Sequence, residues 1–266
     1  MKIEAYTEFG FILWYYLPKA YYLHTQDKLQ STESRIGSKE VFYFSKNHLE
    51  QDIVYDPPKF YPESNTCYNH EPPNFTKDSW LPPPLKEHYK NDRFIFDKPI
   101  VTIHNKTTLE WGGLGIFNYF TTDALEKIIK ELQDNYTIVY IRPPEYEKYS
   151  FKHDPAQRII DIKDEEIIKK YNVLYINDLL EKNKDLTYNQ LQFMLLANSE
   201  KHITSAGEAV IPSYFGGETV IYTHPNCQAS NRGVWKTDSW MSMLSDSKIT
   251  GYQDYDSIIS HIEKNW

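Results

Sequence analysis

The stretch KHITSAGEAVIPSYFGGETVIYTH, from Lys201 to His224, decides the fold. Its pattern changes from strand to turn to helix and back to strand, at 202–204, 205–207, 208–215 and 219–222, with Gly216-Gly217 ending the helix. A strand, a turn of small residues and a helix together suit an anion, because the backbone can approach the ligand and the helix start points free N–H groups at it. The stretch therefore predicts a site for a phosphate-bearing ligand. The alternative is an ordinary strand–helix connection of an α/β protein.

The same alternation extends over the rear of the chain, from about residue 98. Strands are predicted at 100–103, 136–141, 158–162 and 173–176, and helices at 123–132, 164–171, 188–198 and 255–262. Strands separated by helices of this length imply a parallel sheet with right-handed crossovers. Residues 98–250 therefore predict a doubly wound parallel sheet.

The front of the chain also begins with a strand, a turn and a helix, at 3–7, 8–10 and 11–24, and Pro18 is expected to kink or break that helix. A further strand is predicted at 41–44, and prolines dominate 56–84, where no regular element can persist. We therefore expect an α/β protein with two Rossmann-like domains. The domains are an N-terminal one at 1–95, a larger C-terminal one at 96–250, and a helix within 251–266 that packs back on the N-terminal domain.

Composition limits the function. The chain has 266 residues and a net charge of −8, so a basic surface for nucleic acid is not expected. Its two cysteines, Cys67 and Cys227, argue against a disulfide framework and structural zinc and favour a reducing compartment, so we expect a cytoplasmic protein.

The apolar run at 9–23 is too short to span a bilayer, and the first residues lack the positive cluster of a signal peptide. The 22 tyrosines suit sugars, whose C–H faces stack on aromatic rings.

Ligands of open parallel sheets bind at the carboxyl ends of the strands, and this rule selects the candidate donor-binding residues. They are His104, Asn105, Lys106, Arg142, Arg158, Asp161, Asn177, Asp178, Ser205, Ala206, Gly207 and Glu208. Two cations in this set, Lys106 and Arg142, could neutralise phosphates, and the carboxylates of Asp178 or Glu208 could accept hydrogen bonds from ribose hydroxyls. Each residue alone could equally be a surface or capping residue. Their placement along one edge favours a nucleoside diphosphate.

Several of these motifs resemble one family. The runs PIVTIHNK at 99–106, EWGG at 110–113, VYIRP at 139–143, SAG at 205–207 and SYFGG at 213–217 are similar to the small two-domain GT-B-type glycosyltransferases, including those of large DNA viruses of algae. The resemblance covers roughly residues 98–224, and more loosely 1–50. It implies a nucleotide-sugar donor, UDP-linked, in the C-terminal domain and an acceptor glycan at the N-terminal one. Xylosyl transfer is one activity it implies, with the host cytoplasm as location for a viral protein.

The resemblance also implies a catalytic base that faces the donor. An inverting transferase needs a carboxylate or histidine to take the proton from the acceptor hydroxyl. Glu8 follows the first predicted strand and is the candidate, with capping of the next helix as its alternative role. The candidate acceptor-side residues are His24, His48 and Asp78. Retaining relatives carry two glutamates eight positions apart, and Gly216 stands eight residues after Glu208, which favours inversion.

No metal or other cofactor is expected beyond the nucleotide sugar itself. Asp254-Tyr-Asp256 has a D-x-D spacing used for manganese in another transferase fold, but its place at the start of the last helix favours capping. Two other functions stay open. A non-catalytic glycan- or nucleotide-binding module would need no base, and a phosphate-ester hydrolase would need a metal-binding cluster that the sequence does not offer.

Overall fold

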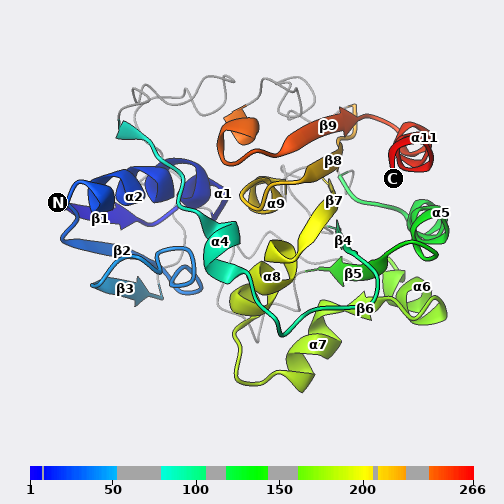
Figure 1. Cartoon of the computed structure of the whole chain (residues 1–266), viewed down its shortest axis with the longest axis horizontal. Coiled ribbons are helices and arrows are strands. Elements are labelled where there is room, and N and C mark those ends of the chain that lie inside the picture. The colour runs from blue at the N-terminus through cyan, green and yellow to red at the C-terminus, as the bar shows by residue number, and fades with distance from the viewer. Residues whose placement is uncertain (8, 53–78, 106–117, 143–160, 206–208, 226–239) are drawn as a thin grey trace.

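The computed structural model describes residues 1–7, 9–52, 79–105, 118–142, 161–205, 209–225 and 240–266 (Figure 1). The described strands are β1 (Lys2–Ala5), β2 (Ser31–Arg35), β3 (His48–Gln51), β4 (Ile100–His104), β5 (Thr137–Ile141), β6 (Leu174–Tyr175), β7 (Ser199–Ser205), β8 (Glu218–Tyr222) and β9 (Lys248–Tyr252). The described helices are α1 (Phe9–Phe11), the π-helix η1 (Ile12–Tyr16), α2 (Leu17–Thr25), α4 (Leu85–Tyr89), α5 (Thr122–Leu132), α6 (Asp164–Lys170), α7 (Ile176–Lys182), α8 (Tyr188–Ala197), α9 (Val210–Ser213), the 3₁₀ helix η4 (Trp240–Met243) and α11 (Tyr255–Asn265).

The rear of the chain forms a six-stranded sheet in the order β6-β5-β4-β7-β8-β9, and every pair in it is parallel. The sequences IVTIH and ETVIY of β4 and β8 are rich in β-branched residues, and every residue of both strands is buried. Strands covered on both faces are typical of parallel sheets with crossover helices. The expected doubly wound parallel sheet is therefore confirmed.

Helices lie on both sides of this sheet. Figure 1 shows α5, α6 and α11 on one side and α8 and α9 on the other. The starts of two of the longer helices are fixed by their own residues: Thr121 caps α5, and Thr187 forms a capping box with Gln190 at the start of α8. In both helices the cap gives a free backbone N–H group of the first turn a side-chain acceptor, which fixes where the helix begins.

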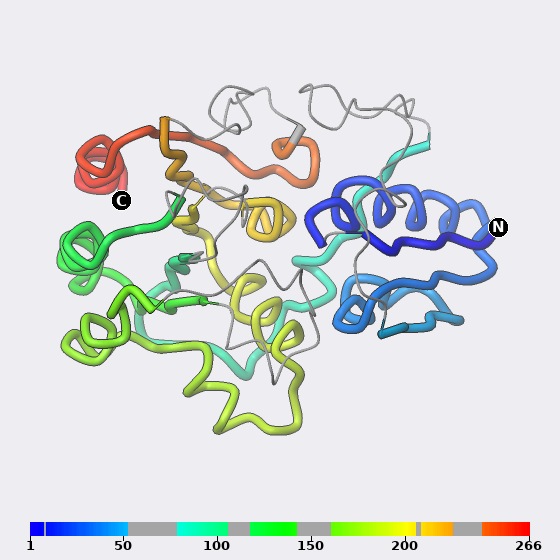
Figure 2. The backbone as a smooth tube through the Cα atoms, turned by 180° about the vertical axis from the view of Figure 1, so that it is seen from behind, coloured from blue at the N-terminus to red at the C-terminus, as the bar shows by residue number. Residues whose placement is uncertain are grey.

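The front of the chain forms a separate three-stranded parallel sheet in the order β1-β2-β3. The helical segment that follows β1 packs toward the larger sheet: η1 contacts α9, as Figure 2 shows from behind, and Tyr214 Oη donates to the Leu13 carbonyl at 2.5 Å. One hydrophobic cluster includes Leu13 and Trp14 from the front and Phe193 and Phe215 from the rear. The two sheets thus share a continuous core, and a division into domains at 1–95 and 96–250 stays a prediction.

Three expectations about elements were wrong. Residues 41–44 form turns, because Val41 and Phe42 fold back onto Ser38 through backbone hydrogen bonds, and the second strand is β2 instead. Residues 161 and 162 are not in a strand, and the rest of the predicted strand at 158–162 lies outside the described residues. The C-terminal helix α11 packs on α5, β8 and β9 rather than on the front sheet, because its apolar side, with Ile258 and Ile262, belongs to the rear core.

Gly217 is required where α9 turns into β8. Its φ is +72°, and a Cβ placed there would lie 2.3 Å from the Glu200 carbonyl oxygen. We expect Gly217→Ala to lower the free energy of unfolding by about 2 kcal/mol or more, since an L-residue in the left-handed region is strained even without a clash. Urea unfolding measures this loss. Gly10→Ala is the matched control, because its added Cβ meets no described atom within 4 Å, and an equal loss in both variants would contradict the prediction.

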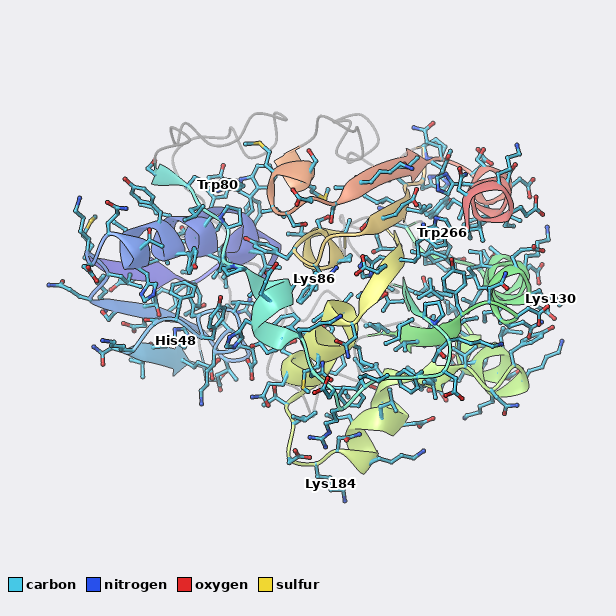
Figure 3. The ribbon with its side chains drawn as sticks, in the orientation of Figure 1. His48, Trp80, Lys86, Lys130, Lys184 and Trp266 are labelled. Atoms are coloured by element: carbon cyan, nitrogen blue, oxygen red, sulfur yellow. The ribbon has the colours of Figure 1, made fainter. Side chains whose placement is uncertain are left out.

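The amino edge of the large sheet is held by Glu218. Its carboxylate accepts hydrogen bonds from Lys201, Lys248 and Trp266, the last at the end of α11 (Figure 3). Burial alone would raise the pKa of Glu218, but the bonds from Lys201, Lys248 and Trp266 outweigh it and lower the pKa to about 2. This carboxylate therefore stabilises the fold fully above its ordinary pKa of 4.5, and the contribution is lost as pH falls toward 2.

We therefore expect wild-type protein to lose stability between pH 5 and pH 3 more steeply than a Glu218→Gln variant. The measurement is chemical unfolding of both proteins at pH 6, 5, 4 and 3. Parallel stability curves for the two proteins would show that Glu218 does not carry the acid sensitivity.

Candidate functional site

The carboxyl edge of the large sheet contains a topological switch point. From β4 the chain moves outward to β5 and β6, and then returns to β7 on the other side of β4 before continuing to β8 and β9. In open parallel sheets ligands bind in the crevice outside the strands at this point. The residues that end the two strands there are His104 of β4 and Ser205 of β7, both buried. The structure places these two residues at one edge of the sheet, and their role in binding a donor stays a prediction.

Asn105 serves the backbone rather than a ligand. Its side-chain oxygen accepts from the Phe120 amide at 2.8 Å, and its side-chain nitrogen donates to the Phe120 carbonyl at 3.1 Å. The side chain is fully buried, so these two bonds satisfy it in a dry environment. Asn105 thus fixes the chain after β4 against the start of α5, and it shapes the edge without offering free polar atoms.

His104 is placed differently. Its side chain is 1% exposed, and neither ring nitrogen has a hydrogen-bond partner among the described residues. On the same face of the sheet, Thr102 Oγ1 pairs with Nδ1 of His202 at 2.8 Å. Burial lowers the pKa of each histidine to about 3, and for His202 the nearby His104 and Lys86 add to the effect. Both rings are therefore neutral at pH 7.

Arg142 follows β5 at the same edge, but its guanidinium is paired with a carboxylate of the protein itself. Its Nη1 donates to Asp164 at 2.5 Å, and Asp164, which is fully buried at the start of α6, also accepts from Tyr140 at 2.5 Å. Burial and Asp164 raise the pKa of Tyr140 well above its usual value. We expected Arg142 to neutralise a phosphate. The structure instead shows its guanidinium in a buried ion pair that joins the end of β5 to α6.

The remaining described donor candidates lie toward the outer strands. Asp161 is exposed and accepts from the backbone and side chain of Lys163, which lowers its pKa. Asn177 and Asp178 lie in the first turn of α7, after the outermost strand β6, where Asp178 is exposed and the buried Asn177 Oδ1 lacks a described partner. The structure therefore does not bring these three residues to the switch point.

Both described acceptor candidates have roles within the small sheet and its helices. His48 uses both ring nitrogens, with Thr32 Oγ1 at 2.8 Å and Ser38 Oγ at 3.2 Å, and burial lowers its pKa. His24 lies near the end of α2, where its ring stacks on Tyr21 and contacts Phe44. His48 is thus a structural residue, while His24 remains half-buried among aromatic rings.

Seven predicted site residues lie outside the described residues: Glu8, Asp78, Lys106, Arg158, Ala206, Gly207 and Glu208. Cys67 and Cys227 lie outside them as well. The neighbours of Glu8 are described: Thr7 follows β1, is 1% exposed, and its Oγ1 has no partner in the described part of the chain. Two residues further, a Cβ added to Gly10 would meet no atom of the described residues within 4 Å.

Three polar residues of this region were not among the predicted site residues: His202 and Thr219, which are fully buried in the large sheet, and Asn118. Strand alternation could have found the first two, because Thr102 and His104 share a face with His202 and Thr219 once the parallel register is known. Asn118 accepts from the His224 amide at 3.0 Å and so joins the chain after β4 to the chain after β8. This contact joins residues 106 positions apart, so no local sequence pattern could predict it.

The D-x-D sequence caps a helix, as expected. Asp254 accepts from the backbone and side chain of Ser257 at 2.7 and 2.9 Å at the start of α11. Within the described ranges, no three His, Cys, Asp or Glu side chains are grouped so that they could hold a metal ion. None of the described helices is both long and apolar enough to cross a bilayer.

Comparison with known proteins identifies the fold but not a family. The sequence matches no protein-family model and no curated protein. The structure is similar to ADP-heptose LPS heptosyltransferase II of E. coli, with a TM-score of 0.53 and 8% identity over 99% of this chain and 97% of that one. Two structures of the wall teichoic acid polymerase TagF also match, with TM-scores of 0.31 and 0.36 and identities of 14% and 12%, each over 91% of this chain and 50% of that one. The likeness to the heptosyltransferase shows a shared GT-B-type fold.

Proposed function

We propose that this protein is an inverting glycosyltransferase that moves a sugar from a nucleotide-sugar donor to a hydroxyl of a glycan acceptor. The observation that carries the proposal is the strand order of the large sheet, whose switch point between β4 and β7 is where dinucleotide and nucleotide ligands bind in doubly wound folds. The three-stranded parallel sheet of the front, with the helical segment that follows β1, lies beside the α9 side of the large sheet. In addition, the fold is similar to that of one glycosyltransferase over 99% of this chain. The proposal divides the chain into an acceptor-side domain at 1–95 and a donor-side domain at 96–250.

The donor side is built from the residues that follow β4 and β7. Lys106 and the segment Ser205 to Glu208 are proposed to bind the diphosphate, through charge and through backbone N–H groups. Arg142 supports this edge through Asp164 and is not proposed as a phosphate ligand. Stabilising the leaving diphosphate by fixed donors would supply the electrostatic part of catalysis without a metal.

The acceptor side carries the proposed base, Glu8. In the reaction the acceptor hydroxyl gives its proton to the Glu8 carboxylate while its oxygen forms a bond to the anomeric carbon. The bond from that carbon to the diphosphate oxygen breaks on the opposite face, and its electron pair leaves with the nucleoside diphosphate. A single displacement of this kind inverts the anomeric centre. Among the described residues, the buried hydroxyl of Thr7 has no hydrogen-bond partner and no atom lies within 4 Å of a Cβ added to Gly10, and both observations support a polar site after β1.

The donor is proposed to be UDP-linked, with xylose as one candidate sugar, following the resemblance to the algal-virus enzymes. The heptosyltransferase of similar fold uses ADP-heptose according to its name. An adenine nucleotide is therefore the competing donor class, and the acceptor is an oligosaccharide or glycan.

Nucleotide screening tests the proposal directly. We expect UDP to raise the melting temperature by several degrees at about 100 times its dissociation constant, because a ligand that binds only the native state adds about 2.7 kcal/mol. ADP, GDP and dTDP serve as comparisons, and inorganic phosphate at equal ionic strength is the control. If none of the four diphosphates shifts the transition, the proposed function is wrong.

A non-catalytic glycan- or nucleotide-binding module would pass the same screen. Slow hydrolysis separates the two functions, because a transferase incubated with its nucleotide sugar alone releases free nucleoside diphosphate, whereas a binding module does not. Chromatographic detection of that product over hours, with boiled protein as the blank, decides between them.

A further inference from the structure

A row of polar side chains crosses the middle of the face of the large sheet that α8 and α9 cover. It contains Thr102, His104, His202, Thr204 and Thr219, from three neighbouring strands, and each is at most 1% exposed. Internal bonds satisfy part of this row: Thr102 pairs with His202, and Thr204 Oγ1 donates to the Ser205 carbonyl. The exceptions among the described residues are both nitrogens of His104, Nε2 of His202 and Oγ1 of Thr219.

Orphaned buried polar atoms are costly, so a native structure that keeps them needs a reason. The position of each residue along its strand shows which of these unpaired groups lies where a ligand could reach it. Thr219 is the second residue of β8 and aligns with His202, two residues before the level of His104. His104 is the last residue of β4, beside the switch point. Of these groups, His104 is the one at the edge where a ligand can replace the missing partner.

We propose that His104 binds the diphosphate part of the donor, its ring donating a hydrogen bond to a diphosphate oxygen at the switch point between β4 and β7. This inference rests on the proposed function and assigns one residue of the donor site. A neutral imidazole carries one N–H donor and one acceptor nitrogen, so the ring can donate without first taking up a proton.

The surroundings favour this role. The strands beside His104 present Ile141 of β5 and Thr204 of β7 in register, both buried, so the bond forms in a dry environment where hydrogen bonds to charged oxygens are strong. Among the described residues, a titratable group near His104 is His202 of β7, which burial keeps neutral. The positive charge of Lys86 in α4 lowers the pKa of His202 further. Lys86 is itself paired with Glu200 at 2.8 Å, at the amino end of β7 (Figure 3).

The test uses three variants of the full chain, with binding of UDP and ADP measured by calorimetry and stability measured by thermal unfolding. His104→Phe keeps a planar ring and removes both nitrogens. We expect its melting temperature to be equal to or above that of wild type, because an apolar group replaces an orphan, while nucleotide affinity falls roughly ten- to a hundred-fold. His104→Gln keeps a donor and is expected to retain more affinity than His104→Phe.

Thr219→Val is the matched control. It removes a hydroxyl that has no described partner from the same face, two residues before the level of His104, so its stability should be equal or higher and its nucleotide affinity unchanged. Equal affinity in His104→Phe and wild type would overturn the inference and leave the proposed function standing, with the His104 ring satisfied by buried water instead. If wild type binds none of the four nucleoside diphosphates of the screen, both the inference and the proposed function are overturned; if it binds GDP or dTDP instead of UDP or ADP, that diphosphate is used to compare the variants. If His104→Phe does not fold, a fourth variant, His104→Ala, decides, because it also leaves no donor at this position: unchanged nucleotide affinity together with lowered stability would show a purely structural role.

Discussion

Replacing Glu8 by glutamine is expected to lower the rate of glycosyl transfer by about 10²- to 10⁴-fold, the usual contribution of a general base. Glutamine has nearly the size of glutamate but cannot accept the proton of the acceptor hydroxyl at neutral pH. Donor affinity should change little, because the nucleotide is proposed to bind the other sheet. The loss should therefore fall on kcat at saturating donor. The measurement is product formation with the donor that the nucleotide screen selects.

Glu4→Gln is the control for this prediction. Glu4 belongs to β1, is exposed and pairs with Lys2, so its removal changes the local charge equally without touching the end of the strand. Exposed ion pairs contribute little, and transfer should stay near the wild-type rate. If Glu8→Gln keeps full activity, Glu8 is a helix-capping residue and the base must be sought elsewhere. If Glu8→Gln also abolishes nucleotide binding, a direct catalytic role is no longer supported.

The periodic elements of the large sheet could be predicted because their signals are local. β4, β5 and β8 are short apolar runs bounded by polar residues, and α5 and α8 begin at threonine caps, so the pattern alone identifies them. Strand β9 was missed because its sequence KITGY carries a glycine and few apolar residues. Pairing with β8 stabilises this strand, and such a tertiary contact cannot be predicted from the residues of a short sequence window.

The small sheet was harder to predict for the same reason. β2 has the sequence STESR, which reads as a loop, yet four of its five residues are buried because β1 and β3 flank it on both sides. The apolar run at 41–44 gives a stronger strand signal and forms turns, since its side chains fill the core below α2 and α4. Tertiary burial overrides intrinsic preference in both cases.

The predictions for the site residues succeeded where they needed only local information and failed where they depended on distant partners. The rule that ligands bind at strand ends placed His104 and Ser205 at one edge correctly, because it needs only the strand boundaries. It could not show that Asn105 is bound to Phe120 or that Arg142 is bound to Asp164, since these partners are 15 and 22 residues away in sequence. A charged residue at a strand end is thus a candidate ligand only until its partners are known.

Arg142→Ala is therefore expected to act first on stability. Removing the guanidinium leaves the fully buried carboxylate of Asp164 with Tyr140 and without its cation, and breaking one side of a buried pair costs about 3–5 kcal/mol. For a chain of this size the melting temperature should fall by roughly 10 °C. The exposed pair of Lys163 and Asp161, at 2.6 Å, gives the matched control: Lys163→Ala should leave the melting temperature close to that of wild type, although its ion pair is nearly as short.

The double variant Arg142→Ala, Asp164→Ala separates this structural role from phosphate binding. Because it removes the uncompensated charge as well, it should recover part of the stability lost in Arg142→Ala, and the four proteins together give the coupling energy of the pair. Nucleotide affinity, measured well below every melting temperature, should be similar in wild type and the double variant. Preserved stability together with weakened nucleotide binding in Arg142→Ala would instead make Arg142 a phosphate ligand, and the ion pair with Asp164 would be a contact that the donor displaces.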